Sequence, residues 1–393
     1  MMQTIYFDYN ATTPLDAEVR EAMLPFLGEV WGNPSSVHHV GRRARSLLDD
    51  ARERAARILD CKASEVVFTG GGTESINLAI FGTARLLRPK GRHIVTSAIE
   101  HHAVLRSFDY LARKEGFELT RLPVDRQGLV SPDMLKRALR ADTILVSIMA
   151  ANNEIGTVQP VGELGAICRD HGVKFHTDTV QWLGKEPFTG VHQFNADLVS
   201  ICAHKMHGPK GVGAVFVKSP LQPDPLLFGG THENERRAGT ENLAGIIGLV
   251  EALERFVSEP VFPKSRLLAL TGRLAGLLDR LEGVQTISPR QQRLANTVSF
   301  VVEGADNAAL LAGLDLEGIC ASGGSACSAG SPEPSHVVRA LGLEERLAYS
   351  LVRFYLGRET TATEVEQVEG VLPQIISRAQ GSGQRASLPV FSR

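Results

Sequence analysis

The sequence predicts an α/β fold built on a mostly parallel sheet. Short apolar runs alternate with helix-length amphipathic segments between about residues 65 and 217. Strands buried on both faces read as continuous apolar runs, and helices connect them across the sheet. Sheets of this kind place ligands beyond the carboxyl ends of their strands. We therefore look for functional residues where each apolar run ends.

The individual elements follow from residue spacing. A helical pattern covers 37–60, where apolar residues recur at steps of three and four. Further helical patterns lie at 75–87, 103–114, 132–140 and 161–171. They separate strand-like runs at 65–69, 93–97, 118–124, 143–150, 173–177, 198–203 and 213–217. We therefore expect a seven-stranded main sheet.

The alternation fades after Asn242, and Pro260 and Pro263 mark a break. Beyond it, strands are expected at 297–302 and 351–356, and helices at 265–281, 307–314, 335–341 and 362–380. This pattern predicts a large domain at 15–260 and a smaller α+β domain made of 1–14 plus 261–380. The polar residues 381–393 are expected to form a flexible tail.

Composition narrows the class of protein. The net charge is -2 and charged residues make up 22%, so we expect no direct nucleic-acid partner and no membrane surface. We see no signal-peptide pattern and no apolar stretch long enough to span a bilayer, which predicts a cytoplasmic protein. The five cysteines are scattered without a Cys-x-x-Cys pair, so neither a disulfide framework nor a zinc knuckle is expected.

A glycine turn, Gly70-Gly71-Gly72-Thr73, follows one strand and opens a helix. Glycines allow close backbone approach, and free N–H groups at a helix start bind phosphate. A plain tight turn with a helix cap explains the same residues. The turn is not a Walker A loop, because no Gly-Lys-Ser/Thr ends it.

Asp178 ends another strand. A carboxylate there could pair with a protonated ring nitrogen, which pyridoxal 5'-phosphate (PLP) needs to act as an electron sink. It could equally cap a helix.

The strand at 198–203 delivers His204 and Lys205 to its carboxyl end. Lysine is costly to bury, and its amine can form a Schiff base with an aldehyde cofactor. Lys210 competes for this role, but its Pro-Lys-Gly setting is typical of an exposed turn. His204 and His207 lack further spaced partners for a metal site.

A single thiol, Cys327, lies among small residues between 321 and 332. Structural cysteines usually lie in apolar cores, as we expect for Cys61, Cys168 and Cys320. Cys327 is instead expected to be accessible and reactive. The alternative is a flexible loop with an incidental cysteine.

Several motifs occur in one order along the chain: Thr73, His101, Asn153-Glu154-Ile155-Gly156, Asp178, Gln181, His204-Lys205, Arg237-Ala238-Gly239-Thr240 and Cys327. Together they resemble the cysteine desulfurases of the NifS/IscS type, a branch of the class V aminotransferase family. The resemblance extends from residues 5–14 to 353–357. It implies a fold-type I PLP-dependent transferase that acts as a homodimer. The reaction would convert L-cysteine to L-alanine and leave a persulfide on Cys327.

The resemblance also implies residue roles. Lys205 would form the Schiff base, His101 would stack on the ring and assist proton transfer, and Cys327 would attack sulfur. Asp178 would pair with the ring nitrogen and Gln181 with the ring hydroxyl. The remaining roles are phosphate binding by Gly72, Thr73, Cys202, His204 and the other subunit's Thr240, a cofactor contact by Ala203, and substrate binding by Asn153 and Arg353, with Asn153 also beside the cofactor.

The persulfide would pass to an iron–sulfur scaffold protein or a tRNA-thiolation carrier. Through it, Cys327 could act as a transient iron–sulfur ligand. Some positions depart from the family pattern: Cys202 and Tyr355 stand where serine is common, Thr179 where alanine is usual, and 231–236 replaces a more typical Gln-Glu-Arg-Gly sequence. Three alternatives remain at this point: a selenocysteine lyase, an aminotransferase or lyase that does not use Cys327, and a scaffold-binding regulatory homologue.

Overall fold

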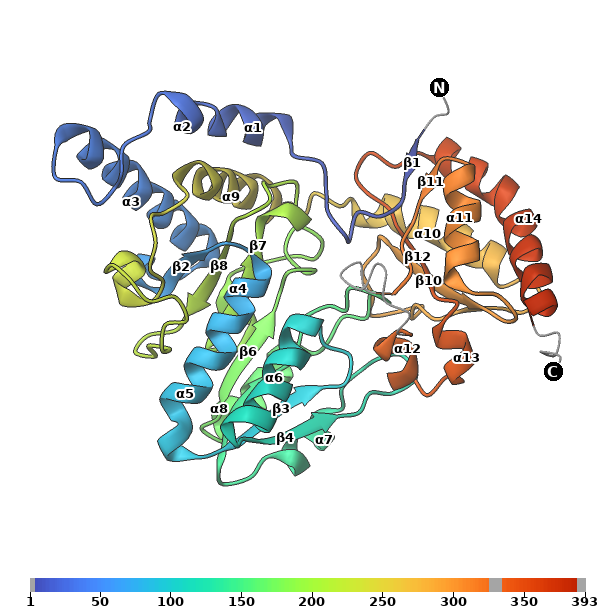
Figure 1. The fold of residues 1–393 in the computed structure, drawn as a ribbon, viewed down its shortest axis with the longest axis horizontal. Helices are drawn as coiled ribbons and strands as arrows, with labels where there is room; N and C mark the ends of the chain where they lie inside the picture. The colour runs from blue at the N-terminus through green and yellow to red at the C-terminus, as the bar shows by residue number, and fades with distance from the viewer. Residues whose placement is uncertain (1–3, 325–333, 387–393) are drawn as a thin grey trace, which may run out of the picture.

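The computed structural model describes residues 4–324 and 334–386. Its largest sheet has seven strands in the order β2-β8-β7-β6-β5-β3-β4 (Figure 1). All neighbours pair in parallel except those of β8, which is antiparallel to both β2 and β7. The predicted fold class is therefore confirmed. The strands are β2 (Val66–Thr69), β3 (His93–Ser97), β4 (Glu118–Leu122), β5 (Thr143–Ser147), β6 (Lys174–Asp178), β7 (Leu198–Cys202) and β8 (Gly213–Val217).

Helices cover both faces of this sheet because its side chains alternate between two apolar clusters. Val95 of β3 joins the cluster that contains α3 (His39–Leu59), α8 (Val161–Asp170) and α9 (Leu243–Phe256). Its neighbour Ile94 joins the opposite cluster, with α4 (Gly72–Asn77), α5 (Thr83–Leu87) and α6 (His102–Glu115). The other helices of this part are α1 (Ala17–Met23), α2 (Pro25–Gly28) and α7 (Pro132–Ala138).

A smaller antiparallel sheet has the order β12-β10-β9, formed by β12 (Val352–Tyr355), β10 (Thr297–Val302) and β9 (Val284–Thr286). It packs with α10 (Lys264–Leu278), α11 (Asn307–Leu316) and α14 (Ala362–Ala386), beside α12 (His336–Ala340) and α13 (Glu345–Ala348) (Figure 1). The N-terminal strand β1 (Ile5–Tyr6) pairs in parallel with β11 (Ile319–Cys320) on the same side of the molecule. The N-terminal residues therefore pack with the C-terminal elements; the domain boundaries themselves remain a prediction.

Several elements differ from their predicted bounds. The helix expected at 75–87 begins at Gly72 and contains a wider turn at Leu78–Gly82. Strand β5 ends at Ser147 instead of 150, since the next residues leave the ladder and Met149 lines a cavity. Helix α14 continues to Ala386, so the tail expected from 381 begins in a helix.

The four described cysteines are free, as expected. Cys168 is buried, but Cys61 and Cys320 are only partly buried, which corrects their placement in the core. Cys61 follows the C-terminal end of α3, and Cys320 lies in a two-stranded sheet, so neither is enclosed on all sides.

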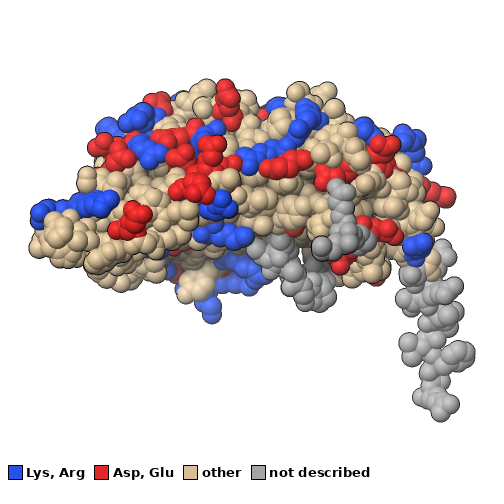
Figure 2. All heavy atoms as spheres, turned by 90° about the horizontal axis from the view of Figure 1, so that it is seen from above, with Lys and Arg blue, Asp and Glu red and all other residues tan. Residues whose placement is uncertain are grey.

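Acidic and basic side chains are interspersed over the face seen in Figure 2, in keeping with the small net charge. Across residues 4–324 and 334–386, no helix has the length and apolarity needed to cross a bilayer.

The aromatic cluster around Phe354 generates the first prediction. Phe354 is fully buried, and its ring centroid lies 5.8 Å from Phe7 and 5.4 Å from Phe300. Phe354→Ala should lower the free energy of unfolding by about 3–5 kcal/mol, because it removes ring contacts and leaves a cavity. Urea unfolding measures this change. Leu316→Ala is the control: that side chain is 77% exposed, and its loss should change stability by no more than about 0.5 kcal/mol. Equal effects of the two substitutions would contradict the prediction.

Candidate active site

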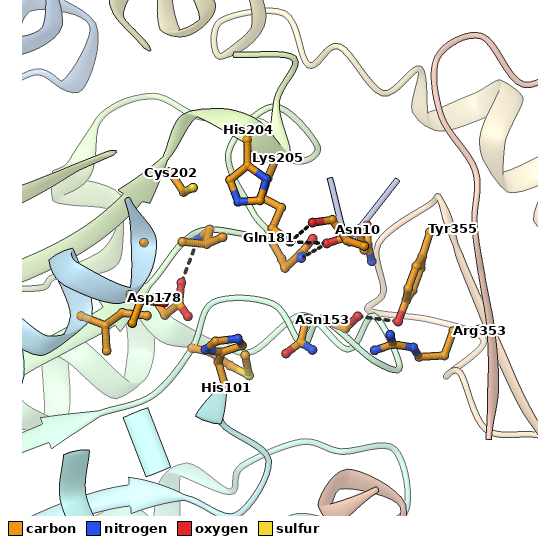
Figure 3. Close-up of a pocket in the computed structure, with 16 residues that line it drawn as sticks. Asn10, His101, Asn153, Asp178, Gln181, Cys202, His204, Lys205, Arg353 and Tyr355 are labelled. Carbon is orange, nitrogen blue, oxygen red and sulfur yellow. Dashed lines mark hydrogen bonds between the residues drawn. The ribbon is translucent and has the colours of Figure 1, made fainter. Parts of the chain in front are cut away.

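A cavity of about 200 Å³ lies beyond the carboxyl ends of β6 and β7 (Figure 3). Residues from the helix start after β2, from the loops after β3 and β5, and from β12 also reach it. This is the edge at which parallel sheets commonly bind ligands. The lining residues are Asn10, Ala11, Gly72, Thr73, Ile76, His101, Met149, Asn153, Asp178, Val180, Gln181, Cys202, His204, Lys205, Arg353 and Tyr355.

Asp178 ends β6 with its carboxylate in the cavity wall (Figure 3). One carboxylate oxygen accepts a hydrogen bond from the backbone N–H of Val180 at 2.9 Å. Burial raises the pKa of Asp178 to about 6, although that hydrogen bond and the charge of Lys205 oppose the rise. A buried carboxylate with unused acceptor positions is well suited to pair with a cationic N–H group.

The glycine turn forms the adjoining wall. A Cβ added at Gly72 would lie 3.0 Å from Val180 Cγ2 and 3.4 Å from Cys202 Cβ, so glycine keeps this corner open. Cys202 is buried, and burial raises the pKa of its thiol. The nearby backbone N–H groups of Gly72 and His204 oppose this rise in the pKa. The thiol is therefore held at the boundary between β7 and the start of α4.

Lys205 reaches the N-terminal segment. Its Nζ donates to the backbone carbonyl oxygens of Asn10 at 2.5 Å and Ala11 at 2.7 Å (Figure 3). Lys210 is exposed, as its turn-like setting predicted. These contacts hold the Lys205 amine at the cavity between the two sheets.

Two histidines line the cavity in neutral form. Burial, with the charge of Lys205 adding to it, lowers the pKa of both His101 and His204 to about 4. His101 Nδ1 accepts from the backbone N–H of Ala103 at 3.1 Å, so the proton of the neutral ring lies on Nε2. His204 Nδ1 lies 3.1 Å from the Thr12 hydroxyl.

The smaller sheet supplies the cationic end of the cavity. Arg353 is 2% exposed, and its Nε has no hydrogen-bond partner among the described residues. Its guanidinium carbon lies 5.1 Å from the centre of the Tyr355 ring. The Tyr355 hydroxyl donates to the Asn153 carbonyl oxygen at 2.6 Å, which ties Asn153 to β12 (Figure 3). A buried guanidinium beside an amide is a binding site for a carboxylate.

Two predicted site residues do not line the cavity, and a third is not among the residues that the structure describes. Ala203 is fully buried and does not line the cavity, and Thr240 is exposed outside it. Cys327, with the possible metal-ligand role, lies outside the described residues. In the described ranges, no group of three or more His, Cys, Asp or Glu side chains could hold a metal ion.

Sequence reasoning assigned no role to Asn10, Ala11, Met149 or Tyr355, all of which line the cavity. The first two lie in the Ile5–Pro14 stretch that carries part of the family resemblance. That position was the only available signal for them, because their contacts depend on tertiary packing.

Comparison with known proteins assigns the chain to a family. A profile of the family described as aminotransferase class-V matches residues 5–368. The chain belongs to the class V aminotransferase family. The cysteine desulfurase IscS of Dictyoglomus turgidum is 48% identical over 96% of both chains. That of Methanosarcina thermophila is 46% identical over 96% of this chain and 93% of its own.

Solved structures of class V relatives have the same architecture. A NifS-like protein superimposes with a TM-score of 0.89 at 36% identity, covering 96% of this chain and all of the other. A cysteine desulfurase from Thermococcus onnurineus gives a TM-score of 0.84 at 27% identity, covering 95% of each chain. The predicted resemblance and fold type are therefore confirmed.

Enzymes of this family use PLP, and the cavity has groups that fit it. The buried Asp178 carboxylate matches a protonated ring nitrogen. The open corner at Gly72, with the Thr73 hydroxyl beside it, matches a phosphate, and the Lys205 amine matches an aldehyde carbon. Opposite these groups, Arg353 leaves a place for a substrate carboxylate.

The burial of Asp178 predicts a pH-dependent stability cost. In the unfolded chain this carboxyl titrates near 3.8, whereas its folded pKa is about 6. Between these pH values the folded state holds a proton that the unfolded state has lost, so the stability contributed by this group falls as pH rises. Asp178→Asn should therefore stabilise the PLP-free protein by about 2–3 kcal/mol above pH 6 and by far less near pH 4.

Urea unfolding of the PLP-free wild type and Asp178→Asn at several pH values measures the difference. Other buried groups, such as Glu100 and His101, titrate in both proteins, so their contributions largely cancel in the stability difference between the two. A stability difference that does not vary with pH would contradict the raised pKa.

Proposed function

We propose that this cavity removes sulfur from L-cysteine, with Lys205 holding PLP and Cys327 receiving the sulfur. Family membership and the likeness to cysteine desulfurases confirm the reaction class, a PLP-dependent desulfuration. One observation supports the residue assignment above all: the Asp178 carboxylate, the Lys205 amine and the Arg353 guanidinium line the same cavity from three different elements. PLP, when bound, supplies an electron sink for charge that develops on the substrate's carbon atoms.

The residues of the chain would divide the remaining work. Arg353 and Asn153 would bind the substrate carboxylate and hold its α-carbon toward Lys205. The Lys205 amine would move the proton between substrate carbon atoms. His101 would stay neutral and keep its proton on Nε2 as a hydrogen-bond donor, because its Nδ1 already accepts from Ala103. Asp178 would remain ionised once a cationic partner offsets its burial.

The sulfur step would use Cys327 as a thiolate. Its sulfur attacks the sulfur of the substrate, so a carbon–sulfur bond breaks while a sulfur–sulfur bond forms. The carbon atom that has lost its sulfur takes a proton, the product is released as L-alanine, and Cys327 carries a persulfide. Atoms and electrons balance without a further oxidant or reductant.

A homodimer would explain how Thr240 could bind the cofactor phosphate in the other subunit's site. Thr240 is exposed and does not line the cavity of its own subunit. Nearby in the sequence, Arg237 Nε donates to the Glu74 carboxylate at 2.7 Å. Glu74 also accepts from the backbone N–H of Gly70 at 2.7 Å, so this segment is linked to the glycine turn. Large apolar side chains are exposed on this side, with Trp31 at 73% and Phe228 at 85%. A second copy that covered them would bring Thr240 to the partner's phosphate site.

The persulfide would then pass to another protein, such as an iron–sulfur scaffold or a tRNA-thiolation carrier. Delivery to an iron–sulfur scaffold would make Cys327 a transient ligand of iron through its persulfide. We place this activity in the cytoplasm, where thiols stay reduced.

Cys327→Ala tests the sulfur step. The variant should bind PLP and cysteine as the wild type does but form no protein persulfide, because the receiving thiol is missing. Alanine production should fall to background. Persulfide labelling with peptide mapping, together with an alanine assay, measures both. Cys320→Ala is the matched control and should keep the persulfide. A persulfide that persists in Cys327→Ala would move the receiving thiol to another cysteine.

Arg353→Ala tests substrate binding. Charge-assisted hydrogen bonds to a carboxylate contribute about 1.5–3 kcal/mol, so the KM for cysteine should rise roughly 10- to 150-fold. The affinity for PLP should change far less, since Arg353 lies at the opposite end of the cavity from Gly72 and Thr73. Steady-state kinetics and PLP titration separate the two effects. Arg273→Ala, which removes an exposed guanidinium paired with Glu369, is the control. An unchanged KM would exclude Arg353 from carboxylate binding.

A further inference from the structure

A second lysine, Lys185, lies behind the cavity and does not line it. It is 3% exposed and is the only lysine in the described part of the chain that is buried. No carboxylate of the described residues lies within ion-pair distance of it. A buried ammonium without a counter-charge costs folding free energy, so its contacts are of interest.

Lys185 donates to two neutral oxygens. Its Nζ lies 2.7 Å from Asn10 Oδ1 and also donates to Gln181 Oε1. The same nitrogen lies 5.2 Å from the centre of the Phe262 ring. Burial lowers the pKa of Lys185 well below its ordinary value, and the charge of Lys205 lowers it further. The amine is a donor to both oxygens whether it carries three protons or two.

These contacts set the orientation of the Gln181 amide. Its oxygen faces the Lys185 amine, while its nitrogen donates to the backbone carbonyl of Asn10 at 3.0 Å. A carbonyl can only accept, so a flipped amide would set two oxygens against each other. The second N–H of Gln181 is therefore available on the cavity side, where this residue is part of the lining.

Lys185 holds Asn10 in the same way. Asn10 Oδ1 accepts from Lys185 and from Asn296 Nδ2 at 3.0 Å, which leaves Asn10 Nδ2 to donate to Thr297. The backbone carbonyl of Asn10 accepts from Lys205. The Lys185 amine thus contacts the side chains of both Asn10 and Gln181, which line the cavity beside Lys205.

We propose that Lys185 is a positioning residue, which holds the Gln181 amide and Asn10 so that a donor faces the ring oxygen of PLP and an acceptor faces Lys205. This inference rests on the proposed function of the cavity. The ligand group addressed by Gln181 is a hydrogen-bond acceptor, since only a donor is offered to it.

A double-mutant cycle on PLP binding tests the proposal. The four proteins are the wild type, Lys185→Met, Gln181→Ala and the double variant, each prepared without PLP and titrated with it. Lys185→Met keeps the length and apolar stem but removes the donor. It should weaken PLP binding roughly two- to tenfold, the effect of one ordinary hydrogen bond. In the Gln181→Ala background the same substitution should have a smaller effect, because one of the two residues that Lys185 holds is already gone.

Two further readouts separate positioning from packing. The visible absorption spectrum of bound PLP should change in the same direction in Lys185→Met and Gln181→Ala. Urea unfolding of the PLP-free proteins reports any loss of stability, and Lys174→Met, on a lysine paired with Asp197, is the matched control that should leave PLP binding unchanged. If Lys185→Met does not fold, Lys185→Leu, which also lacks a donor, replaces it in the cycle with the same expected outcome.

The outcomes are distinct. The positioning role would be overturned if the fold-losses in PLP affinity of the two single variants multiplied in the double variant. An unchanged PLP affinity in Lys185→Met would also overturn it. A wild-type protein that does not bind PLP would instead overturn the proposed function of the cavity. Non-additive losses with a shared spectral change would support the role of Lys185.

Discussion

The passage of residues 5–13 between the two sheets is the constraint on which the cavity depends. Phe7 joins the smaller sheet, where its carbonyl accepts from the backbone N–H of Tyr355 at 2.8 Å. Six residues later, the Thr13 hydroxyl donates to the carbonyl oxygen of His204 at 3.0 Å and accepts from the N–H of His207 at 2.7 Å. Because one short segment bonds both to β12 and to the residues that follow β7, it sets the distance between Arg353 on one side and Lys205 on the other.

The cavity gathers ionisable groups that destabilise an empty protein. Asp178 is buried with a raised pKa, and Lys185 is buried with a lowered one. The histidines are driven to the neutral form by the same burial. Such groups persist where a ligand or a reaction uses them, so activity and stability oppose each other here. A cofactor with a cationic ring nitrogen and an anionic phosphate would offset much of this cost.

Neutral histidines have a chemical consequence. His204 and His101 lie close to the positive charge of Lys205, which favours their unprotonated rings. A neutral His101 can lie against an aromatic ring without adding a second charge beside it. Under the proposed function, the Lys205 amine would then carry the moving proton, and His101 could assist it only as a neutral donor through Nε2.

The sequence by itself determined the order of strands and helices, the family, and the residues that end strands. Asp178 and Lys205 could be predicted because each directly follows an apolar run, and parallel strands present their carboxyl ends at one edge. Cys202 could be placed beside the glycine turn only through the resemblance. All of these assignments depend on local patterns and on motifs in the chain.

Tertiary structure alone decided how distant segments meet. The bonds of Asn10 to Lys185, and of Lys205 to Ala11, join residues that are 175 and 194 positions apart. Sequence periodicity does not predict such a pairing, because it arises only where the N-terminal segment crosses between the two sheets. The orientation of the Gln181 amide has the same origin: a side chain can carry either end toward a cavity, and only its buried neighbours determine which.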